Sequence, residues 1–259
     1  MKLLFVWCGP VSSFDLKGIT WPAGTSIAVY GHGPSGGISS ADFGLAAAKY
    51  RGANGRILPN LVAKVGYDIA NFDRIAVAGF SAAHGLLAQV LRDDADGKYV
   101  DAALSEDACF SSPTSISKPG YTQYSARAAR GEKLFVHVGT AGDYQGVTGW
   151  QCALTNAAAG AKAAGMSLAS VGVPSGVPAP KSALGVGDLV ALDYSGVLSH
   201  KQVVPALTAP LVNAYLLPYL RGADFGGEPP ASSSAKTVVV AGATLVALAG
   251  GLYAWKRWG

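Results

Sequence analysis

The chain has 259 residues and a formal net charge of +4; 50% of its residues are hydrophobic and only 14% are charged. This length and apolar content are enough for one large domain with a substantial core. The positive charges are spread along the sequence instead of forming a basic stripe, so we expect no nucleic-acid partner.

Short apolar runs typical of strands alternate with helical patterns over most of the chain. Expected strands span residues 2–8, 26–31, 74–80, 100–105, 134–138 and 189–194. Expected helices span residues 58–69, 82–91, 150–164 and 203–220, the last as a packed helix of a soluble domain. This alternation predicts an α/β domain with a mostly parallel sheet and helices on both faces. Active sites of such sheets lie at the carboxyl ends of the strands.

The most informative segment is residues 74–91, where a buried strand leads through Gly-Phe-Ser-Ala-Ala at positions 79–83 into a helix. A strand that turns sharply into a helix strains its apex residue, and only small side chains fit two positions before and after it. Gly79 and Ala83 meet this requirement. The hydroxyl of Ser81 would then stand clear of the sheet at the positive end of the helix.

This strand, turn and helix resemble the nucleophile elbow of the α/β-hydrolase superfamily, and the resemblance covers residues 1 to about 220. It implies a serine hydrolase that works through an acyl-enzyme, with no metal or organic cofactor. The superfamily orders its catalytic residues along the chain as serine, acid and histidine. A serine hydroxyl needs such a neighbouring base because it is a poor nucleophile at neutral pH.

Four histidines compete for the role of that base: His32, His84, His137 and His200. His200 follows the last expected strand, and a loop there can reach back over Ser81. We therefore expect His200 to be the general base. His84 lies one helical turn beyond Ser81. If substitution of His84 abolished activity, His84 and not His200 would be the base.

Two aspartates follow strand ends and could be the acid. Asp107 closes the strand after the Ser81 helix, whereas Asp143 lies in a glycine-containing loop after the next strand, the commoner position in the superfamily. We favour Asp107 because it lies at the strand terminus itself, and the other aspartate would cap its loop. Asp188 and Asp193 are weaker candidates that could cap turns.

The oxyanion hole should use the backbone N–H of Ala82 and one from an earlier strand-end loop. Gly33, in the glycine-rich loop at residues 31–37, is the expected second donor, with Ser35 and the loop at residues 8–13 as alternatives. Residues 166–187 contain three prolines and several glycines, and could form a lid or a plain surface connection.

The three cysteines, Cys8, Cys109 and Cys152, have no metal-ligand spacing, and their odd number is no disulfide framework. We expect all three to be buried, reduced thiols.

The end of the sequence differs in composition from the rest. We assign residues 1–224 to the catalytic domain, 225–236 to a Gly/Pro/Ser-rich linker, 237–255 to a transmembrane helix and 256–259 to a short basic tail. Residues 237–255 carry no charge, and 19 residues at about 1.5 Å each give roughly 28 Å, close to the thickness of a bilayer core. Ala243, Ala247 and Gly251 form a small-residue stripe that would permit a homo-oligomer.

The side of the membrane follows less directly from the sequence. Lys256 and Arg257 favour a cytoplasmic end, which would place the domain outside. The apolar run at residues 3–7 is too short for a signal peptide, so we expect the domain on the side of synthesis.

Together these features predict a membrane-anchored serine hydrolase that cleaves a small-molecule or lipid ester. Two alternatives stay open. The first is a hydrolase-fold binding or structural protein without turnover, because a fold does not dictate function. The second is a serine peptidase.

Overall fold

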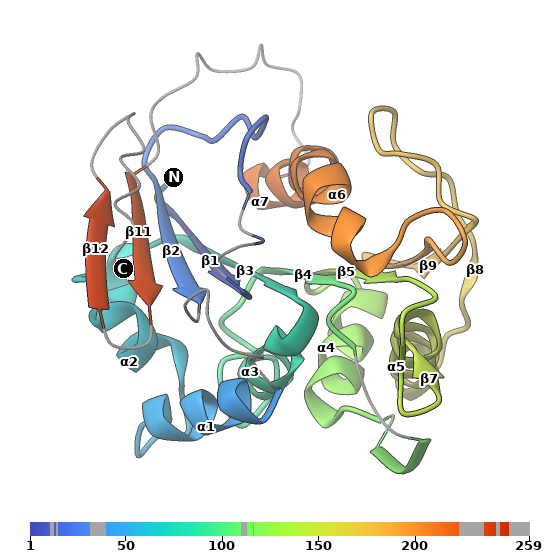
Figure 1. Ribbon diagram of the computed structural model, residues 1–259, viewed down its shortest axis with the longest axis horizontal. Helices are drawn as coiled ribbons and strands as arrows, with labels where there is room; N and C mark the ends of the chain where they lie inside the picture. The colour runs from blue at the N-terminus through green and yellow to red at the C-terminus, as the bar shows by residue number, and fades with distance from the viewer. Residues whose placement is uncertain are drawn as a thin grey trace, which may run out of the picture.

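The computed structural model describes residues 1–10, 13, 15–31, 40–109, 113–115, 117–222, 236–241 and 244–248. One sheet organises them, with the strand order β12-β11-β2-β1-β3-β4-β5-β10-β9-β8 (Figure 1). Its centre consists of parallel strands. These are β1 (Leu3–Cys8), β2 (Thr25–Gly31), β3 (Arg74–Phe80), β4 (Ala102–Glu106), β5 (Leu134–Gly139) and β10 (Leu189–Asp193). They are the six expected strands, so the predicted fold class, an α/β domain with a mostly parallel sheet, is confirmed.

The edge beyond β10 is antiparallel. There, β9 (Ser182–Val186) pairs with β10, and β8 (Ala169–Ser170) pairs with β9. Both strands lie in the stretch that the sequence left open as a lid or a surface connection. A separate small hairpin, β6 (Asp143–Tyr144) and β7 (Val147–Thr148), follows β5.

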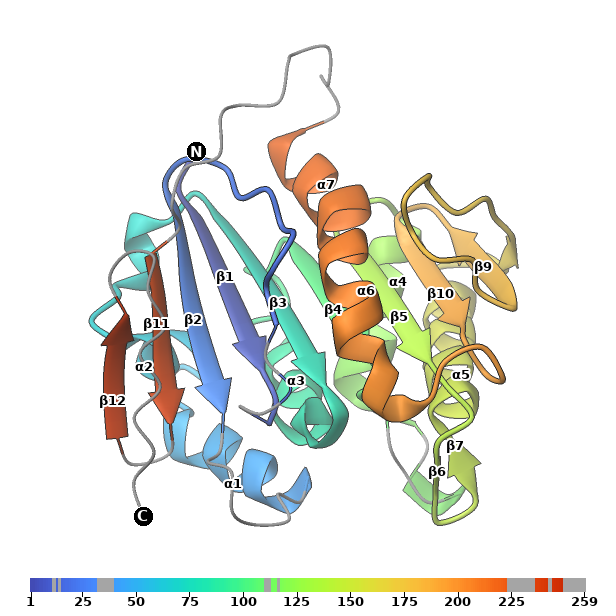
Figure 2. The same cartoon turned by 45° about the horizontal axis from the view of Figure 1, so that its top comes forward.

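Helices cover both faces of the sheet, as expected, but unequally (Figure 2). One face carries α1 (Ser40–Tyr50), α2 (Leu58–Ala63), α3 (His84–Val90), α4 (Pro119–Ala129) and α5 (Gly149–Ala163). The other face carries one run formed by the 3-10 turn η5 (His200–Gln202), α6 (Val203–Leu211), the π-helical turn η6 (Val212–Leu216) and α7 (Leu217–Arg221). Smaller 3-10 turns are η2 (Ile69–Asn71), η3 (Ser81–Ala83) and η4 (Pro113–Ser115).

The helical run His200–Arg221 has 22 residues, and an 18-residue window of it has a mean hydropathy of 1.4, so the run is long and apolar enough to span a membrane. Half of that window is buried within the fold. Val203, Leu207 and Leu211 are fully buried in the core on this face of the sheet. It therefore serves here as the core helix that was expected over residues 203–220.

The segment expected to be a transmembrane helix contains strands instead. β11 (Lys236–Ala241) pairs in parallel with β2, and β12 (Thr244–Leu248) pairs antiparallel with β11. A helix over 237–255 is thus not what the structure shows. The reason lies in residues 237–240, Thr-Val-Val-Val, because β-branched residues favour strands and β2 offers an unpaired edge. Linker residues 225–235 and residues 242–243 and 249–259 lie outside the described part.

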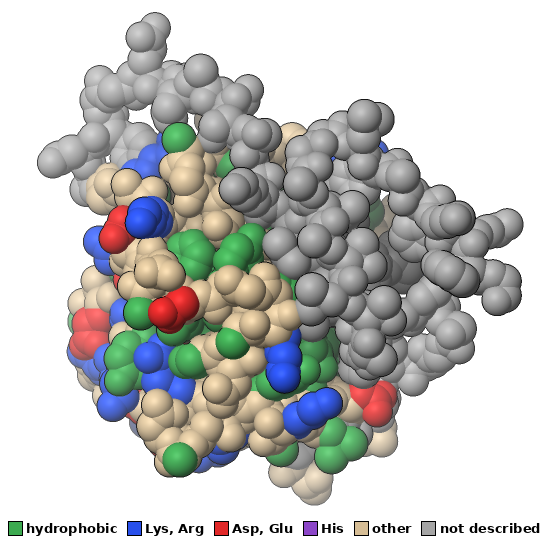
Figure 3. All heavy atoms as spheres, turned by 90° about the vertical axis from the view of Figure 1, so that its left-hand side faces the viewer, with side chains coloured by type: hydrophobic (Ala, Val, Ile, Leu, Met, Phe, Trp, Pro, Cys, Tyr) green, Lys and Arg blue, Asp and Glu red, His purple; other side chains and the backbone are tan. Residues whose placement is uncertain are grey.

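Charged side chains are dispersed on the described surface. Figure 3 shows Lys, Arg, Asp and Glu scattered between apolar side chains over the described part of one face. Several surface side chains are paired: Arg92 Nε lies 2.7 Å from Asp94 Oδ1, and Arg130 Nε lies 2.6 Å from Glu132 Oε1. The dispersed distribution of charges that was expected from the sequence is therefore seen on this described part of the surface.

A buried carboxyl group connects the sheet to the helix on its less covered face. Glu106, the last residue of β4, is fully buried, and Thr208 Oγ1 on α6 donates to its Oε1 at 2.5 Å. Burial raises the pKa of Glu106 to about 8, an effect that the hydrogen bond from Thr208 only partly offsets. Glu106 is therefore largely protonated at neutral pH in the folded protein.

We predict a pH-dependent stability cost at Glu106. Between the ordinary pKa of 4.5 and the folded value of about 8, the unfolded chain loses a proton that the folded chain keeps, so stability falls as pH rises. Glu106→Gln stays neutral. We expect the free energy of unfolding in urea of Glu106→Gln, minus that of the wild type, to increase by about 2–4 kcal/mol from pH 5 to pH 8. If the difference in unfolding free energy between the variant and the wild type stays constant over this pH range, burial does not raise the pKa of Glu106.

Candidate active site

The backbone at Ser81 has the geometry expected of an exposed apex. β3 passes directly into η3 there, and Ser81 has φ +56°, in the left-handed region. A Cβ atom at Gly79 would lie 3.0 Å from Leu87 Cδ2 and 3.5 Å from Ala83 Cβ, and Ala83 is fully buried. The crowding that was expected to demand small residues at positions 79 and 83 is therefore present.

A chain of hydrogen bonds joins three of the predicted site residues. His200 Nε2 lies 2.9 Å from Ser81 Oγ, and His200 Nδ1 lies 2.7 Å from Asp107 Oδ2. Ser81 follows β3, Asp107 follows β4, and His200 follows β10, so all three come from carboxyl ends of parallel strands. Asp107 is fully buried and Ser81 half-buried, while 30% of the His200 side chain is exposed. The serine and histidine are thus open to a reactant, and the carboxylate behind them is not.

The buried carboxylate of Asp107 accepts further hydrogen bonds from Thr140. The Thr140 backbone N–H donates to Oδ1 at 2.9 Å and its Oγ1 donates to Oδ2 at 2.6 Å. Gly149 closes the site on another side, since a Cβ there would collide with Oδ1. Thr140 was not among the site residues predicted from the sequence, although its position directly after β5, the neighbour of β4, was an available signal.

The imidazole of His200 is held by its face as well as by its nitrogens. Phe80 stacks on it with ring centroids 4.7 Å apart and an interplanar angle of 19°. With Nδ1–H donating to Asp107, the neutral ring presents Nε2 as an acceptor to the Ser81 hydroxyl. This orientation is the one in which the histidine can take a proton from the serine.

Two other histidines are placed where they cannot do this. His137 is buried in β5 with its ring centroid 3.9 Å from that of Phe135, and burial lowers its pKa to about 3. His84 is buried in α3, and burial together with the charge of Lys118 lowers its pKa to about 4. His32 lies outside the described residues.

The alternative acids have other roles. Asp143 is exposed in β6, and its Oδ1 accepts the backbone N–H of Gly146 at 2.7 Å, which caps the hairpin. His200 Nδ1 lies against Asp107, so the structure brings together the histidine and the favoured one of the two candidate acids. Asp193 Oδ1 accepts the backbone N–H of Ser195 at 2.7 Å and so caps a turn.

Only part of the expected oxyanion hole can be placed. Ala82 directly follows Ser81 in η3 and is half-buried. Gly33 and Ser35 lie outside the described residues. In the alternative loop, the Gly9 N–H donates to Tyr30 O at 3.1 Å, so the sheet already uses it.

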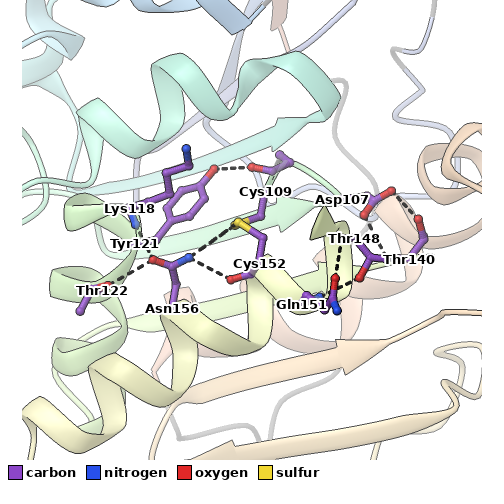
Figure 4. The surroundings of a disulfide bond; sticks show 11 residues. Asp107, Cys109, Lys118, Tyr121, Thr122, Thr140, Thr148, Gln151, Cys152 and Asn156 are labelled. Carbon is purple, nitrogen blue, oxygen red and sulfur yellow. Dashed lines mark hydrogen bonds between the residues drawn. A yellow bond between two sulfur atoms is a disulfide. The ribbon is translucent and has the colours of Figure 1, made fainter. Parts of the chain in front are cut away.

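Two of the cysteines form a disulfide beside Asp107 (Figure 4), contrary to the expectation of reduced thiols. Cys109 and Cys152 are bonded, with Cα atoms 5.5 Å apart. The two cysteines are 43 residues apart in the sequence, and this spacing does not indicate that they lie close together. They come together because the end of β4 lies against α5. Cys8 is the expected buried thiol, and burial raises its pKa to about 12.

Comparisons with known proteins give this site no family context. The chain matches no protein-family description, no curated protein and no solved structure. The chemistry of the site therefore follows from its own geometry.

The two aspartates can be separated by experiment. We expect Asp107→Asn to slow the reaction of Ser81 with a fluorophosphonate probe by about a thousandfold, because an amide at this position favours the wrong imidazole tautomer. Asp143→Asn is the matched control and should leave the rate within about twofold. Mass spectrometry of the labelled peptide gives the rate. Equal effects of the two substitutions would contradict the assignment of the acid.

Proposed function

We propose that this protein is a serine hydrolase that cleaves an ester through an acyl-enzyme. The observation that carries the proposal is the hydrogen-bonded chain Ser81, His200 and Asp107, with distances of 2.9 and 2.7 Å. A hydroxyl, an imidazole and a buried carboxylate in this order form the arrangement that activates a serine. We propose no metal or organic cofactor for this chemistry.

In the first half of the reaction, Ser81 Oγ attacks the ester carbonyl while His200 Nε2 accepts its proton. Asp107 stabilises the imidazolium through Nδ1–H, and the N–H of Ala82 stabilises the oxyanion. The imidazolium then gives its proton to the leaving alcohol, and the serine stays acylated. In the second half, His200 takes a proton from a water molecule, whose oxygen attacks the acyl carbonyl. The bond between the acyl group and Ser81 Oγ then breaks, the imidazolium returns the proton to Oγ, and the carboxylic acid leaves.

The α/β-hydrolase superfamily is the proposed relationship. It is supported by the parallel sheet, by the turn from β3 into α3 at Ser81, and by the order serine, acid, histidine along the chain. The acid follows β4, the strand immediately after the one that carries the serine, instead of β5. Under this proposal the acid occupies the less common of the two positions expected from the superfamily.

Ser81→Ala tests the proposed function directly. Hydrolysis of p-nitrophenyl acetate should fall to the background rate, while the free energy of unfolding stays within about 1 kcal/mol, because only one partly exposed oxygen is removed. His200→Gln should cause a comparable loss, and His84→Gln should not. An unreactive wild-type serine would support the binding-protein alternative, and faster cleavage of peptides than of esters would support the peptidase.

Membrane attachment through residues 237–255 is a separate proposal that rests on composition. The run has no charged residue and is followed by Lys256 and Arg257. Strands β11 and β12 and a spanning helix are alternative conformations of the same residues. The disulfide of Cys109 and Cys152 supports an oxidising compartment for the domain, which agrees with Lys256 and Arg257 on the cytoplasmic side and opposes the earlier expectation of the side of synthesis.

The two conformations lead to different behaviour in membranes. If the segment spans a bilayer, the full chain should stay in the membrane pellet after an alkaline carbonate wash. A chain that stops at Gly226 should then be soluble and keep its esterase activity and melting temperature. Release of the full chain by carbonate, together with a lower melting temperature of the shortened chain, would show that β11 and β12 belong to the sheet and would overturn membrane attachment.

A further inference from the structure

We propose that the disulfide between Cys109 and Cys152 is a positioning element for Asp107, so that efficient hydrolysis requires it. This inference rests on the proposed function, since it concerns the acid of the same site. The contacts of the loop after β4 carry it, and Figure 4 shows four of the residues that surround this loop, Tyr121, Cys109, Cys152 and Asn156, together with Asp107.

Asp107 has an unfavourable backbone conformation. It is the first residue after β4, and its φ of +47° lies in the left-handed region, which is unfavourable for a residue other than glycine. Its N–H donates to Val138 O at 3.0 Å, so the sheet holds it on one side. A residue in such a conformation persists only when its surroundings hold it on the other side too.

The chain beyond Asp107 supplies that second hold. The hydroxyl of Tyr121, a fully buried residue on α4, donates to Ala108 O at 2.7 Å. One residue later, Cys109 is covalently joined to Cys152 on α5. The two residues after the acid are thus tied to two different helices.

The helix at the far end of the disulfide also forms a wall of the carboxylate site. α5 begins at Gly149, whose missing side chain makes room for Asp107 Oδ1, and Cys152 lies three residues further along. Thr148 and Gln151 cap this end reciprocally, at 2.9 and 3.1 Å. The disulfide therefore fixes the loop that carries the acid to the same helix end that the acid contacts.

Asn156 completes the enclosure of the sulfur atoms. Its Nδ2 donates to Cys152 O at 2.9 Å and lies 3.6 Å from Cys109 Sγ, and its Oδ1 accepts the N–H of Lys118 at 2.7 Å. Cys109, Cys152 and Asn156 are all fully buried. The disulfide is thus part of a rigid, buried joint between the acid loop, α4 and α5.

Precise placement matters because the Asp107 carboxylate orients His200 through a single short hydrogen bond. A misplacement of about 1 Å in catalytic geometry can cost about a hundredfold in rate. Loss of the covalent joint would let the loop relax from its left-handed conformation and move the carboxylate away from Nδ1. The substrate does not touch this joint, so the loss should appear in kcat and not in KM.

The test compares the double variant Cys109→Ala/Cys152→Ala with the wild type, using p-nitrophenyl acetate below the melting temperature of both. We expect kcat to fall by about tenfold to a hundredfold, with KM within about twofold. Cys8→Ala, which removes the buried thiol and keeps the disulfide, is the matched control and should retain kcat. Unchanged kcat in the double variant would overturn the proposal.

A double-mutant cycle separates positioning from general stabilisation. In an Asp107→Asn background there is no carboxylate to position, so removing the disulfide should lower the remaining rate by less than about twofold. A purely structural disulfide would cost the same factor in both backgrounds, and that result would overturn the proposal.

A readout independent of turnover distinguishes failure of this inference from failure of the proposed function. The proton of the hydrogen bond from His200 Nδ1 to Asp107 should give a downfield NMR resonance in the wild type that shifts or disappears in the double variant. An unchanged resonance would overturn positioning even if the wild type hydrolyses no ester, whereas a wild type without ester hydrolysis would by itself overturn only the function.

If the double variant does not fold, the folded wild type is reduced with a water-soluble phosphine. One water molecule supplies the oxygen of the phosphine oxide and the hydrogens of the two thiols. Because the disulfide is fully buried, its reduction is first verified by alkylating the two thiols under denaturing conditions and weighing the product by mass spectrometry. The resonance is then compared before and after this verified reduction. A shift or loss of the resonance in protein with unchanged far-ultraviolet circular dichroism supports the proposal, and an unchanged resonance overturns it.

Discussion

The hydrogen bond between Asp107 and His200 is the interaction on which the site depends. It spans 93 residues of sequence at 2.7 Å, and it joins a fully buried carboxylate to a histidine that is partly exposed. A buried carboxylate is costly unless donors surround it, and Thr140 supplies two while His200 supplies the third. The same requirement explains Gly149, because only a residue without a side chain leaves room for Oδ1. The hydrogen bonds and the space that the Asp107 carboxylate requires thus determine how the ends of β4, β5 and α5 are arranged.

The histidine reaches this carboxylate because of the helix that follows it. His200 lies in η5 at the start of the run His200–Arg221, the one helical run that the described residues place on its face of the sheet. Val203 and Leu207 are buried in the core and hold the run in place, and Thr208 donates a hydrogen bond to Glu106, which precedes Asp107 in the chain. A sequence apolar enough for a membrane is thus used as the support of a polar site. Burial against the sheet, and not hydropathy alone, decides its role.

Two residues of the site have strained backbone conformations, and they are held in place in different ways. Ser81 and Asp107 both have left-handed backbone conformations, and such strain persists where the surrounding structure is rigid. Around Ser81 the rigidity comes from close packing of Gly79, Ala83 and Leu87. Around Asp107 it comes from hydrogen bonds and a covalent bond, which an oxidising environment would preserve.

The sequence by itself determined the six central strands, the apex at Ser81 and the position of His200 after the last of these strands. These are local properties, because strand periodicity, small residues around a turn and chain order are read within a few residues. Only the tertiary structure showed the hydrogen bond between His200 and Asp107, revealed Thr140, and joined Cys109 to Cys152. It also placed residues 236–241 beside β2, where composition predicted a helix. Each of these depends on distances between segments far apart in the chain, and on which sheet edge is free to pair, which no local pattern encodes.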